Sequence, residues 1–395
     1  MWGCGIRNDP PAAFVAHIGL YYTAMHKAGL ILLGALALAA CDDPVSDVGL
    51  ELLEEGAQPT THRIEPAVFE SDRLNDITGG VTRVLAGRVE DPLFGTVAVN
   101  GYVDFAGSWP AINESTITEM ELQLKPDYVY GDTAASITLG LHALTESWTA
   151  IGAHADMTLP VADEVTKFSF LPTDTLITAL LPETWKDAHS ETIRSQEFET
   201  LFHGFSLKTL SAEAVVGFAT EGSQMLIRTE GDSVAYRMSL TFSNIVRETN
   251  PVPSDGLLSV QDGAGPSVRL NFDIEEFKEL PLNGAMVRVF ADTVATQNVP
   301  AGFARPVANR LQLLKITAPD DPPTLLAVAT LTPDADYRFQ GAALRSFFQN
   351  ALLGLESYTH LELRPPYQEH SLSSIYIREG SAGNGGPEAV LVLSR

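Results

Sequence analysis

The chain is short of cysteine, of positive charge and of long apolar runs, and each shortage excludes a class of structure or partner. Its only two cysteines, Cys4 and Cys41, are too few for a disulfide framework or a zinc site built from cysteines. Its 25 basic side chains stand against 50 acidic ones, which gives a formal charge of −25. Because a field of this sign repels phosphate backbones, we expect no nucleic-acid partner.

Beyond residue 41, no stretch has the roughly 18 consecutive apolar residues that a membrane-spanning helix needs. A shorter apolar run, residues 28–40, follows His26 and Lys27 and ends at Cys41. Its length and basic start are typical of the apolar region of a secretory signal peptide. The alternative is a buried N-terminal helix with an incidental cysteine, but the run has no amphipathic stripe that would favour it.

The end of this run, "LAAC" at 38–41, resembles a bacterial lipobox. That resemblance implies cleavage before Cys41, lipidation of its thiol, and a membrane partner held through the N-terminal lipid. We expect translation to begin at Met25, so that residues 1–24 are an upstream extension foreign to the native protein and 25–40 are a lipoprotein signal peptide. The acidic residues 41–62 then predict an extended, self-repelling tether.

The rest of the chain is dominated by short runs in which apolar and polar residues alternate, such as "ITEMELQL" (117–124) and "ITLGLHAL" (137–144). This period of two, interrupted by Gly, Pro, Asp and Asn, indicates half-buried antiparallel strands. Residues 173–182 and 341–352 predict one short helix in each half. We therefore expect an all-β fold with minor α: two tandem antiparallel β-sandwich or jelly-roll-like domains, each with a short helix, after the signal peptide.

A similar order of elements in the two halves of this body suggests an internal duplication. In each half a strand is followed by a long variable stretch, a short helix, a strand and a closing strand. The segment "NPVPSDG" (250–256) lies between the halves and has the composition of a linker. We predict the first sandwich at 63–249 and the second at 257–395.

One segment, "VLAGRVEDPLFGTVAVNGYVDF" (84–105), resembles the "G-x-x-x-D-P-x-F-G-x-T" motif of a Bacteroidetes lipoprotein family known as domain of unknown function 4270. The matching residues are Gly87, Asp91, Pro92, Phe94 and Gly95, while the threonine falls early, at Thr96. The acidic start after Cys41, "FHGFSLK" (202–208) and the ending "GPEAVLVLS" are also similar to that family. More remotely, residues 117–148 resemble DNRLRE-type jelly-roll modules, with Trp148 as the pattern's tryptophan.

The family resemblance implies an envelope lipoprotein with β-sandwich domains and no assigned activity. In that phylum, acids directly after the lipidated cysteine resemble a surface-export signal, and Asp42 and Asp43 stand there. In enteric bacteria an aspartate at this position favours retention in the inner membrane instead. From the family resemblance we expect an outer-membrane anchor with the body on the cell surface, and the periplasmic face stays open as the alternative.

Common catalytic motifs are missing from the sequence: a Gly-x-Ser-x-Gly elbow, a phosphate-binding glycine loop and a His-Glu-x-x-His pattern. The acid pairs Asp320–Asp321 and Asp334–Asp336 offer oxygen ligands, but neither supplies the six to eight that calcium takes. We therefore predict no catalytic residue, no metal site and no cofactor.

Three aromatic residues, Tyr128, Tyr130 and Trp109, are the best candidates for a ligand platform. Alternation puts the two tyrosines on one strand face, where they could stack against a sugar, although core packing is the alternative for the tryptophan. We expect a non-catalytic binding or display module whose candidate partners are an envelope protein or a glycan. The alternative is an extracytoplasmic hydrolase of glycan or protein, which needs convergent polar side chains in one concave pocket.

Overall fold

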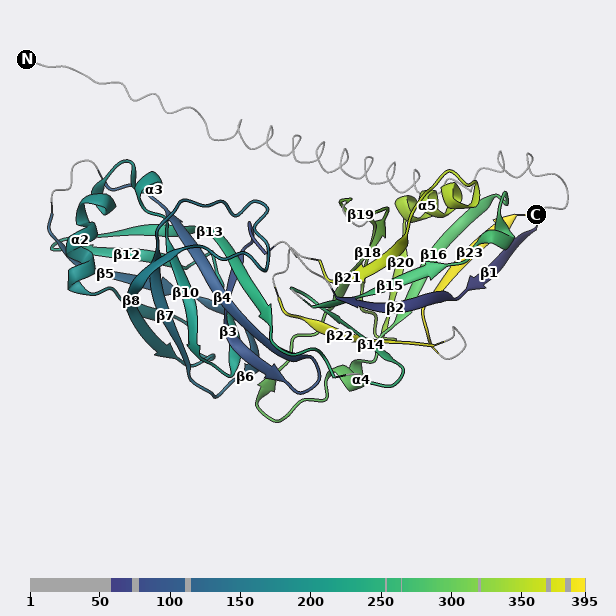
Figure 1. The fold of residues 1–395 in the computed structure, drawn as a ribbon, viewed down its shortest axis with the longest axis horizontal. Helices are drawn as coiled ribbons and strands as arrows, with labels where there is room; N and C mark the ends of the chain where they lie inside the picture. Colours follow the sequence, from purple (N-terminus) through teal and green to yellow (C-terminus); the bar gives the residue numbers. More distant parts are fainter. Residues whose placement is uncertain are drawn as a thin grey trace, which may run out of the picture. The chain divides into compact units, whose positions relative to one another are not determined.

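The computed structural model describes residues 58–72, 78–110, 115–252, 254–263, 265–318, 321–366, 371–380 and 385–394. Within it, Pro59–Arg395 form one compact unit. This unit is mostly β, with antiparallel sheets and a few short helices (Figure 1), which confirms the predicted all-β, sandwich-like fold with minor α. The predicted signal peptide, Cys41, Asp42 and Asp43 lie outside the described residues.

The first half, residues 78–252, consists of eleven described strands and two helices. Ile177–Leu180 alternates buried and exposed side chains, as in a sheet with one face on the core, whereas Ala214–Ala219 is buried along nearly its whole length. The elements are β3 (Arg83–Asp91), β4 (Gly95–Ala106), β5 (Ile117–Leu124), β6 (Pro126–Asp132), β7 (Ile137–Leu144), β8 (Val161–Phe170), β9 (Ile177–Leu180), α2 (Glu183–Arg194), α3 (Phe198–Leu201), β10 (Phe205–Ser211), β11 (Ala214–Ala219), β12 (Gln224–Thr229) and β13 (Ser233–Arg247).

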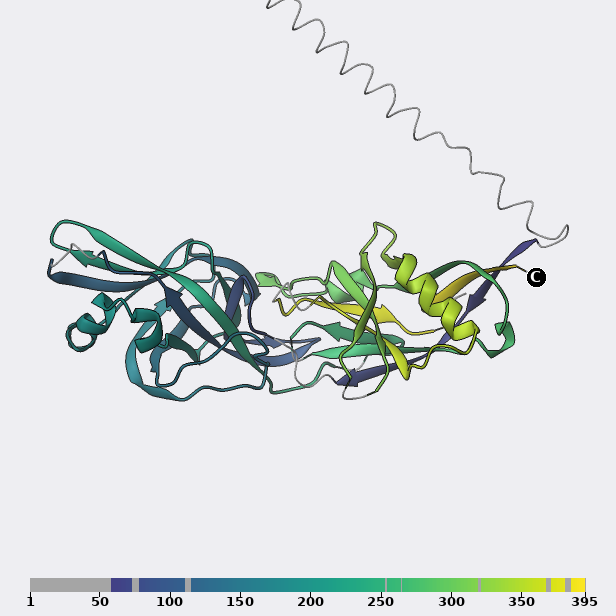
Figure 2. The ribbon, with the colours of Figure 1, turned by 90° about the horizontal axis from the view of Figure 1, so that it is seen from above.

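The second half comprises residues 254–394 together with two strands from the N-terminal side, residues 59–72 (dark blue among the green and yellow strands in Figures 1 and 2). Its elements are β1 (Pro59–Ile64), β2 (Pro66–Asp72), β14 (Leu257–Gln261), β15 (Pro266–Phe272), η2 (Glu275–Phe277), β16 (Leu282–Phe290), α4 (Thr293–Thr296), β17 (Phe303–Ala304), β18 (Arg310–Ile316), β19 (Thr324–Thr330), β20 (Asp336–Gln340), α5 (Ala342–Leu352), β21 (His360–Arg364), β22 (Ser374–Arg378) and β23 (Glu388–Ser394).

The two halves pair their strands in the same order, which agrees with the duplication suggested by the sequence. The first half contains the series β9-β5-β12-β13-β4-β10-β7-β8, and the second contains β20-β16-β23, then β1 and β2, then β15-β21-β18-β19. The chain order of the matching strands is also the same, with one exception. In the first half, β13 is the last strand in the chain and lies between β12 and β4. In the second half, the corresponding position between β23 and β15 is filled by β1 and β2, which come first in the chain.

The predicted boundaries near residue 63 therefore need correction. Residues 59–62, predicted as part of the tether, belong to β1, which pairs with β23. Residues 66–72, predicted as the start of the first sandwich, form β2 and pair with β15 of the second half. Sequence proximity favoured the first half, but the hydrogen-bonded edges that accept this segment lie in the second.

One of the two predicted helices is correct. Residues 342–352 form α5, whose buried side chains are Leu344, Phe347, Phe348, Ala351 and Leu352. The helix predicted at 173–182 is wrong, because Ile177–Leu180 form β9 with alternating buried and exposed positions, and the helix α2 begins only at Glu183. A short apolar run such as "LITALL" fits either structure, and pairing with β5 decided for the strand.

Each half has its own apolar core, and a third cluster joins them. The first core gathers side chains such as Phe105, Phe205 and Tyr236, and the second gathers Val287, Phe339 and Phe348. The third cluster consists mainly of first-half residues but includes Leu372 and, at its edge, Phe303 from the second half. We call this region of contact between the halves the seam.

Candidate functional site

The D-P-x-F-G segment forms the tight turn between β3 and β4. The Oδ1 of Asp91 accepts hydrogen bonds from the backbone N–H groups of Leu93 (2.8 Å) and Phe94 (2.9 Å). Gly95 has a φ of +79°, and a Cβ there would lie 2.3 Å from the backbone oxygen of Thr249. The aspartate and the glycine therefore serve the backbone geometry of this turn.

Asp91 also makes a buried ion pair with Arg305 of the second half. The Nη2 and Nε of Arg305 donate to the two carboxylate oxygens, each at 2.6 Å, and the Tyr130 hydroxyl donates to Oδ2 at 2.8 Å. Only 1% of the arginine side chain and 0% of the aspartate side chain are exposed. Burial, reinforced by the Asp91 carboxylate, raises the pKa of Tyr130 well above its usual range, so the hydroxyl remains a donor.

Aromatic and backbone contacts complete the seam around this ion pair. The Phe94 ring stacks on Tyr376 of the second half at 4.7 Å between centroids, and the Arg305 guanidinium lies 5.3 Å from the same Phe94 ring. The Tyr128 hydroxyl accepts a hydrogen bond from the backbone N–H of Leu372 at 3.0 Å. The motif residues Asp91 and Phe94 therefore hold the two halves together.

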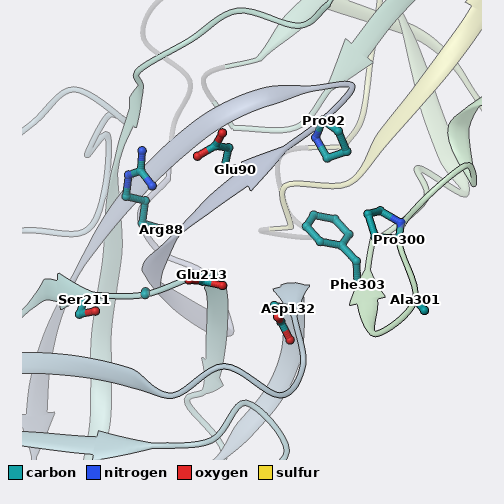
Figure 3. Close-up of a pocket in the computed structure, with 10 residues that line it drawn as sticks. Arg88, Glu90, Pro92, Asp132, Ser211, Glu213, Pro300, Ala301 and Phe303 are labelled. Atoms are coloured by element: carbon teal, nitrogen blue, oxygen red, sulfur yellow. The ribbon is translucent and has the colours of Figure 1, made fainter.

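A pocket of about 640 Å³ is lined in part by Glu90 and Pro92, the chain neighbours of Asp91 (Figure 3). Its volume lies within the range of small-molecule sites. It is formed by β3, the turn after it, the end of β6, the β10–β11 turn and the loop before β17. We call it the seam pocket, and its lining residues are Arg88, Glu90, Pro92, Asp132, Ser211, Ala212, Glu213, Pro300, Ala301 and Phe303.

The seam pocket has one basic and three acidic side chains. Two of these four, Arg88 and Asp132, already interact with other residues. Arg88 forms an ion pair with Glu248 at 2.8 Å, and the Oδ1 of Asp132 accepts the backbone N–H of Ala134 at 2.7 Å. Glu90 and Glu213 are exposed, and neither has an ion-pair partner among the described residues. These two carboxylates can accept hydrogen bonds from ligand hydroxyl or amino groups.

Apolar walls accompany these carboxylates. Phe303 is half-buried and meets the Tyr130 ring edge-on at 6.0 Å between centroids, while Pro92 and Pro300 flank it. A pocket that combines an apolar wall with carboxylate acceptors suits a polar organic ligand.

The predicted aromatic platform is not formed by its three residues. Tyr130 is 0% exposed, and its hydroxyl donates a hydrogen bond to Asp91. Trp109 is only 8% exposed and lies in the first-half core, where the Arg194 guanidinium covers its ring. Tyr128 is half-buried, and its ring lies below Arg83. Tyr128 and Tyr130 share β6, but Trp109 packs in a different cluster.

Sequence reasoning missed Arg305, Glu90 and Glu213. The available signal was Asp91, which lies next to Glu90 in the recognised motif and required a partner once buried. Nothing in the sequence pointed to Arg305 as that partner, because 214 positions separate the two residues.

One described carboxyl outside the seam pocket has an unusual environment. Burial raises the pKa of Asp104 to about 7, and the nearby Glu199 charge adds to the effect, against a backbone hydrogen bond from Phe105. Because this pKa lies near neutral pH, the Asp104 carboxyl should make the stability of the fold depend on pH. Asp104 does not line the seam pocket.

The described part of the chain shows neither a metal cluster nor a membrane-spanning helix. Within it, no group of three His, Cys, Asp or Glu side chains is placed to hold a metal ion. Asp336, one of the acids considered for calcium, is buried, and its carboxylate accepts hydrogen bonds in ion pairs with Arg288 and Arg338. None of the described helices has the length and apolar character needed to cross a bilayer.

Comparisons with known proteins give no neighbour for this chain: no family model matches it, and neither a curated protein nor a solved structure does.

Proposed function

We propose that this chain is a lipoprotein of the outer membrane or cell surface whose β-sandwich body is a non-catalytic binding or display module. The "LAAC" sequence ending at Cys41 supports the lipid anchor. Residues 42–58 between it and β1 would give the body roughly 60 Å of reach if fully extended. Asp42 and Asp43 support export to the surface by their resemblance to such signals.

The seam pocket carries the binding part of the proposal. Two of its lining residues, Glu90 and Pro92, flank Asp91 in the chain, so the buried Asp91–Arg305 pair helps to hold this wall of the pocket in place before a ligand arrives. A preformed site loses less conformational entropy on binding than one that must be ordered. Glu90 and Glu213, on an apolar wall with Phe303, suit a glycan or a polar segment of an envelope protein.

A hydrolase is the second candidate, and the three carboxylates in one pocket are the observation that favours it. General acid catalysis by a carboxyl pair needs one member in a dry environment that keeps it protonated. Both Glu90 and Glu213 are exposed, and Asp132 is held by backbone N–H groups. The arrangement therefore supports ligand binding better than hydrolysis.

The anchor is tested by Cys41→Ser in the native host. The variant should lose the lipid mass, remain unprocessed, and leave the outer-membrane fraction, whereas Ser46→Ala, which keeps Cys41, should behave as wild type. Normal maturation and membrane fractionation of Cys41→Ser would disprove the anchor. Protease treatment of intact cells tests the surface location, and Asp42→Ala/Asp43→Ala should then protect the body from digestion.

The pocket is tested with the double variant Glu90→Gln/Glu213→Gln on an array of bacterial glycans and basic peptides. Ligands of the seam pocket should bind this variant at least about tenfold more weakly, and Glu221→Gln, outside the pocket, should not affect them. Mass spectrometry of the bound ligands separates the candidates. Turnover that disappears with Glu90→Gln would replace the binding proposal with the hydrolase.

A further inference from the structure

Strands β1 and β2 are held in the second half mainly by their backbone. β1 pairs with β23 from Pro59↔Ser394 to Ile64↔Ala389, and β2 pairs with β15 from Pro66↔Phe272 to Asp72↔Pro266. Within residues 59–70, Ile64 is the one buried side chain.

The matching strand of the first half is held very differently. β13 buries Tyr236, Met238, Phe242 and Ile245, and pairs with both β4 and β12. Removing β13 would expose a large apolar surface, whereas removing β1 and β2 would uncover mainly the core contacts of Ile64 and of the half-buried Val68. Segments with few buried apolar contacts open at low free-energy cost, so β1–β2 can detach while the rest of the unit stays folded.

A small set of side-chain contacts makes the edges of β23 and β15 specific for the sequence of β1 and β2. The Arg63 guanidinium donates to both oxygens of Glu388 at 2.7 and 2.6 Å, although Glu388 is only 1% exposed. Glu70 accepts hydrogen bonds from the hydroxyl (2.8 Å) and backbone N–H (3.0 Å) of Ser259.

An apolar contact supports the same register. The His62 ring lies against Phe277 at 4.8 Å between centroids, and Ile64 enters the second-half core. When β1–β2 leaves, Glu388 loses Arg63 and keeps only a distant charge, Arg288 at 4.0 Å. The vacated edge of β23 thus carries an unmatched carboxylate that favours an arginine at one position of any incoming strand.

We propose that the paired edges of β23 and β15 form a strand-acceptor site, and that its intermolecular partner is the β1–β2 segment of a second copy of this chain. Exchange replaces each lost backbone hydrogen bond and the Arg63–Glu388 pair with an identical one, so it costs little free energy once the strand has opened. A foreign strand would supply the backbone hydrogen bonds but leave Glu388, Ser259 and the Ile64 groove unmatched. The contacts therefore favour the chain's own sequence.

The register gives a direct test with two full-length chains in which Cys4 and Cys41 are replaced by serine. One copy carries Thr61→Cys and the other, isotopically heavy, carries Val392→Cys, because Thr61 and Val392 face each other across β1 and β23. After mixing and mild oxidation, mass spectrometry should find a light–heavy disulfide between positions 61 and 392. Adding Ile64→Ala to both copies should increase its rate of formation several-fold, since the strand then opens more often.

The matched control replaces Val392→Cys with Gln340→Cys. Gln340 is exposed on β20, which is separated from β1 by β23 and β16, so exchange cannot bring it next to position 61. The 61–340 link should stay at the level of random collision. Absence of the 61–392 link, or a yield equal to that of the control, would overturn the proposal. The outcome does not depend on lipidation, so the anchor stands or fails separately.

Discussion

Arg305 and Asp91 form an ion pair from which water is almost completely removed, with 2.6 Å between Nη2 and Oδ1 and side chains 1% and 0% exposed. One residue belongs to each half, so their contact is a property of the whole unit. Desolvating two charges is costly, and here two guanidinium hydrogen bonds and the Tyr130 hydroxyl offset that cost. Asp91 also lies between Glu90 and Pro92 in the chain, and these two residues line the seam pocket.

Arg305→Met should destabilise the protein by about 3–5 kcal/mol, because the buried Asp91 carboxylate then lacks its counter-charge. Chemical denaturation followed by tryptophan fluorescence measures the change. Arg88→Met is the matched control: its pair with Glu248 is partly exposed, so the loss should stay below about 1 kcal/mol. Equal losses for the two variants would show that the seam does not depend on the buried pair.

Gly87→Ala should cost roughly 2–4 kcal/mol of unfolding free energy. Gly87 has a φ of +134°, and a Cβ there would lie 2.2 Å from the backbone oxygen of Ala214 in the paired strand β11. Gly231→Ala is the control, since a Cβ at Gly231 meets no atom within 4 Å. The loss of unfolding free energy, measured by chemical denaturation, should be large for Gly87→Ala and stay within about 0.5 kcal/mol for Gly231→Ala. A tolerated alanine at 87 would contradict this close approach of strands.

Asp104 should make the protein less stable as pH rises from about 4 to about 7. Its pKa is about 7 in the folded state, against 3.8 for an aspartate carboxyl in water. The folded state therefore binds more protons than the unfolded state across this pH window. Asp104→Asn should remove this dependence and stabilise the protein above pH 7 by about 1–2 kcal/mol, a figure reduced for partial exposure.

Thermal unfolding at several pH values measures the Asp104 effect. Glu221→Gln, which leaves Asp104 in place, should keep the wild-type slope. An unchanged slope in Asp104→Asn would show that this carboxyl is not the titrating group.

Ile64→Ala should loosen β1–β2 without unfolding the rest of the unit. Truncation of a buried isoleucine typically costs 2–5 kcal/mol, and here the loss falls on a segment with no other buried side chain in residues 59–70. Amide hydrogen exchange should become faster in residues 59–70, while β5 and β12 keep wild-type protection. Uniformly faster exchange would instead mean that β1–β2 and the rest open together.

The sequence by itself determined much of the local structure of this protein. Alternation in residues 117–124 and 137–144 specified strands because a half-buried pleated sheet has a period of two. The spacing of apolar residues in 341–352 specified α5 in the same way. These effects act between near neighbours, so they can be read from consecutive residues.

Only the tertiary structure decided which distant segments meet. Pairing with β23 and β15 placed residues 59–72 in the second half, and pairing with β5 made residues 177–180 a strand. Burial against Asp91 withdrew Tyr130 from any ligand platform, and the meeting of Glu90, Glu213 and Phe303 created the seam pocket. Strand pairing and burial depend on the complementarity of surfaces far apart in the chain, and no local pattern encodes that complementarity.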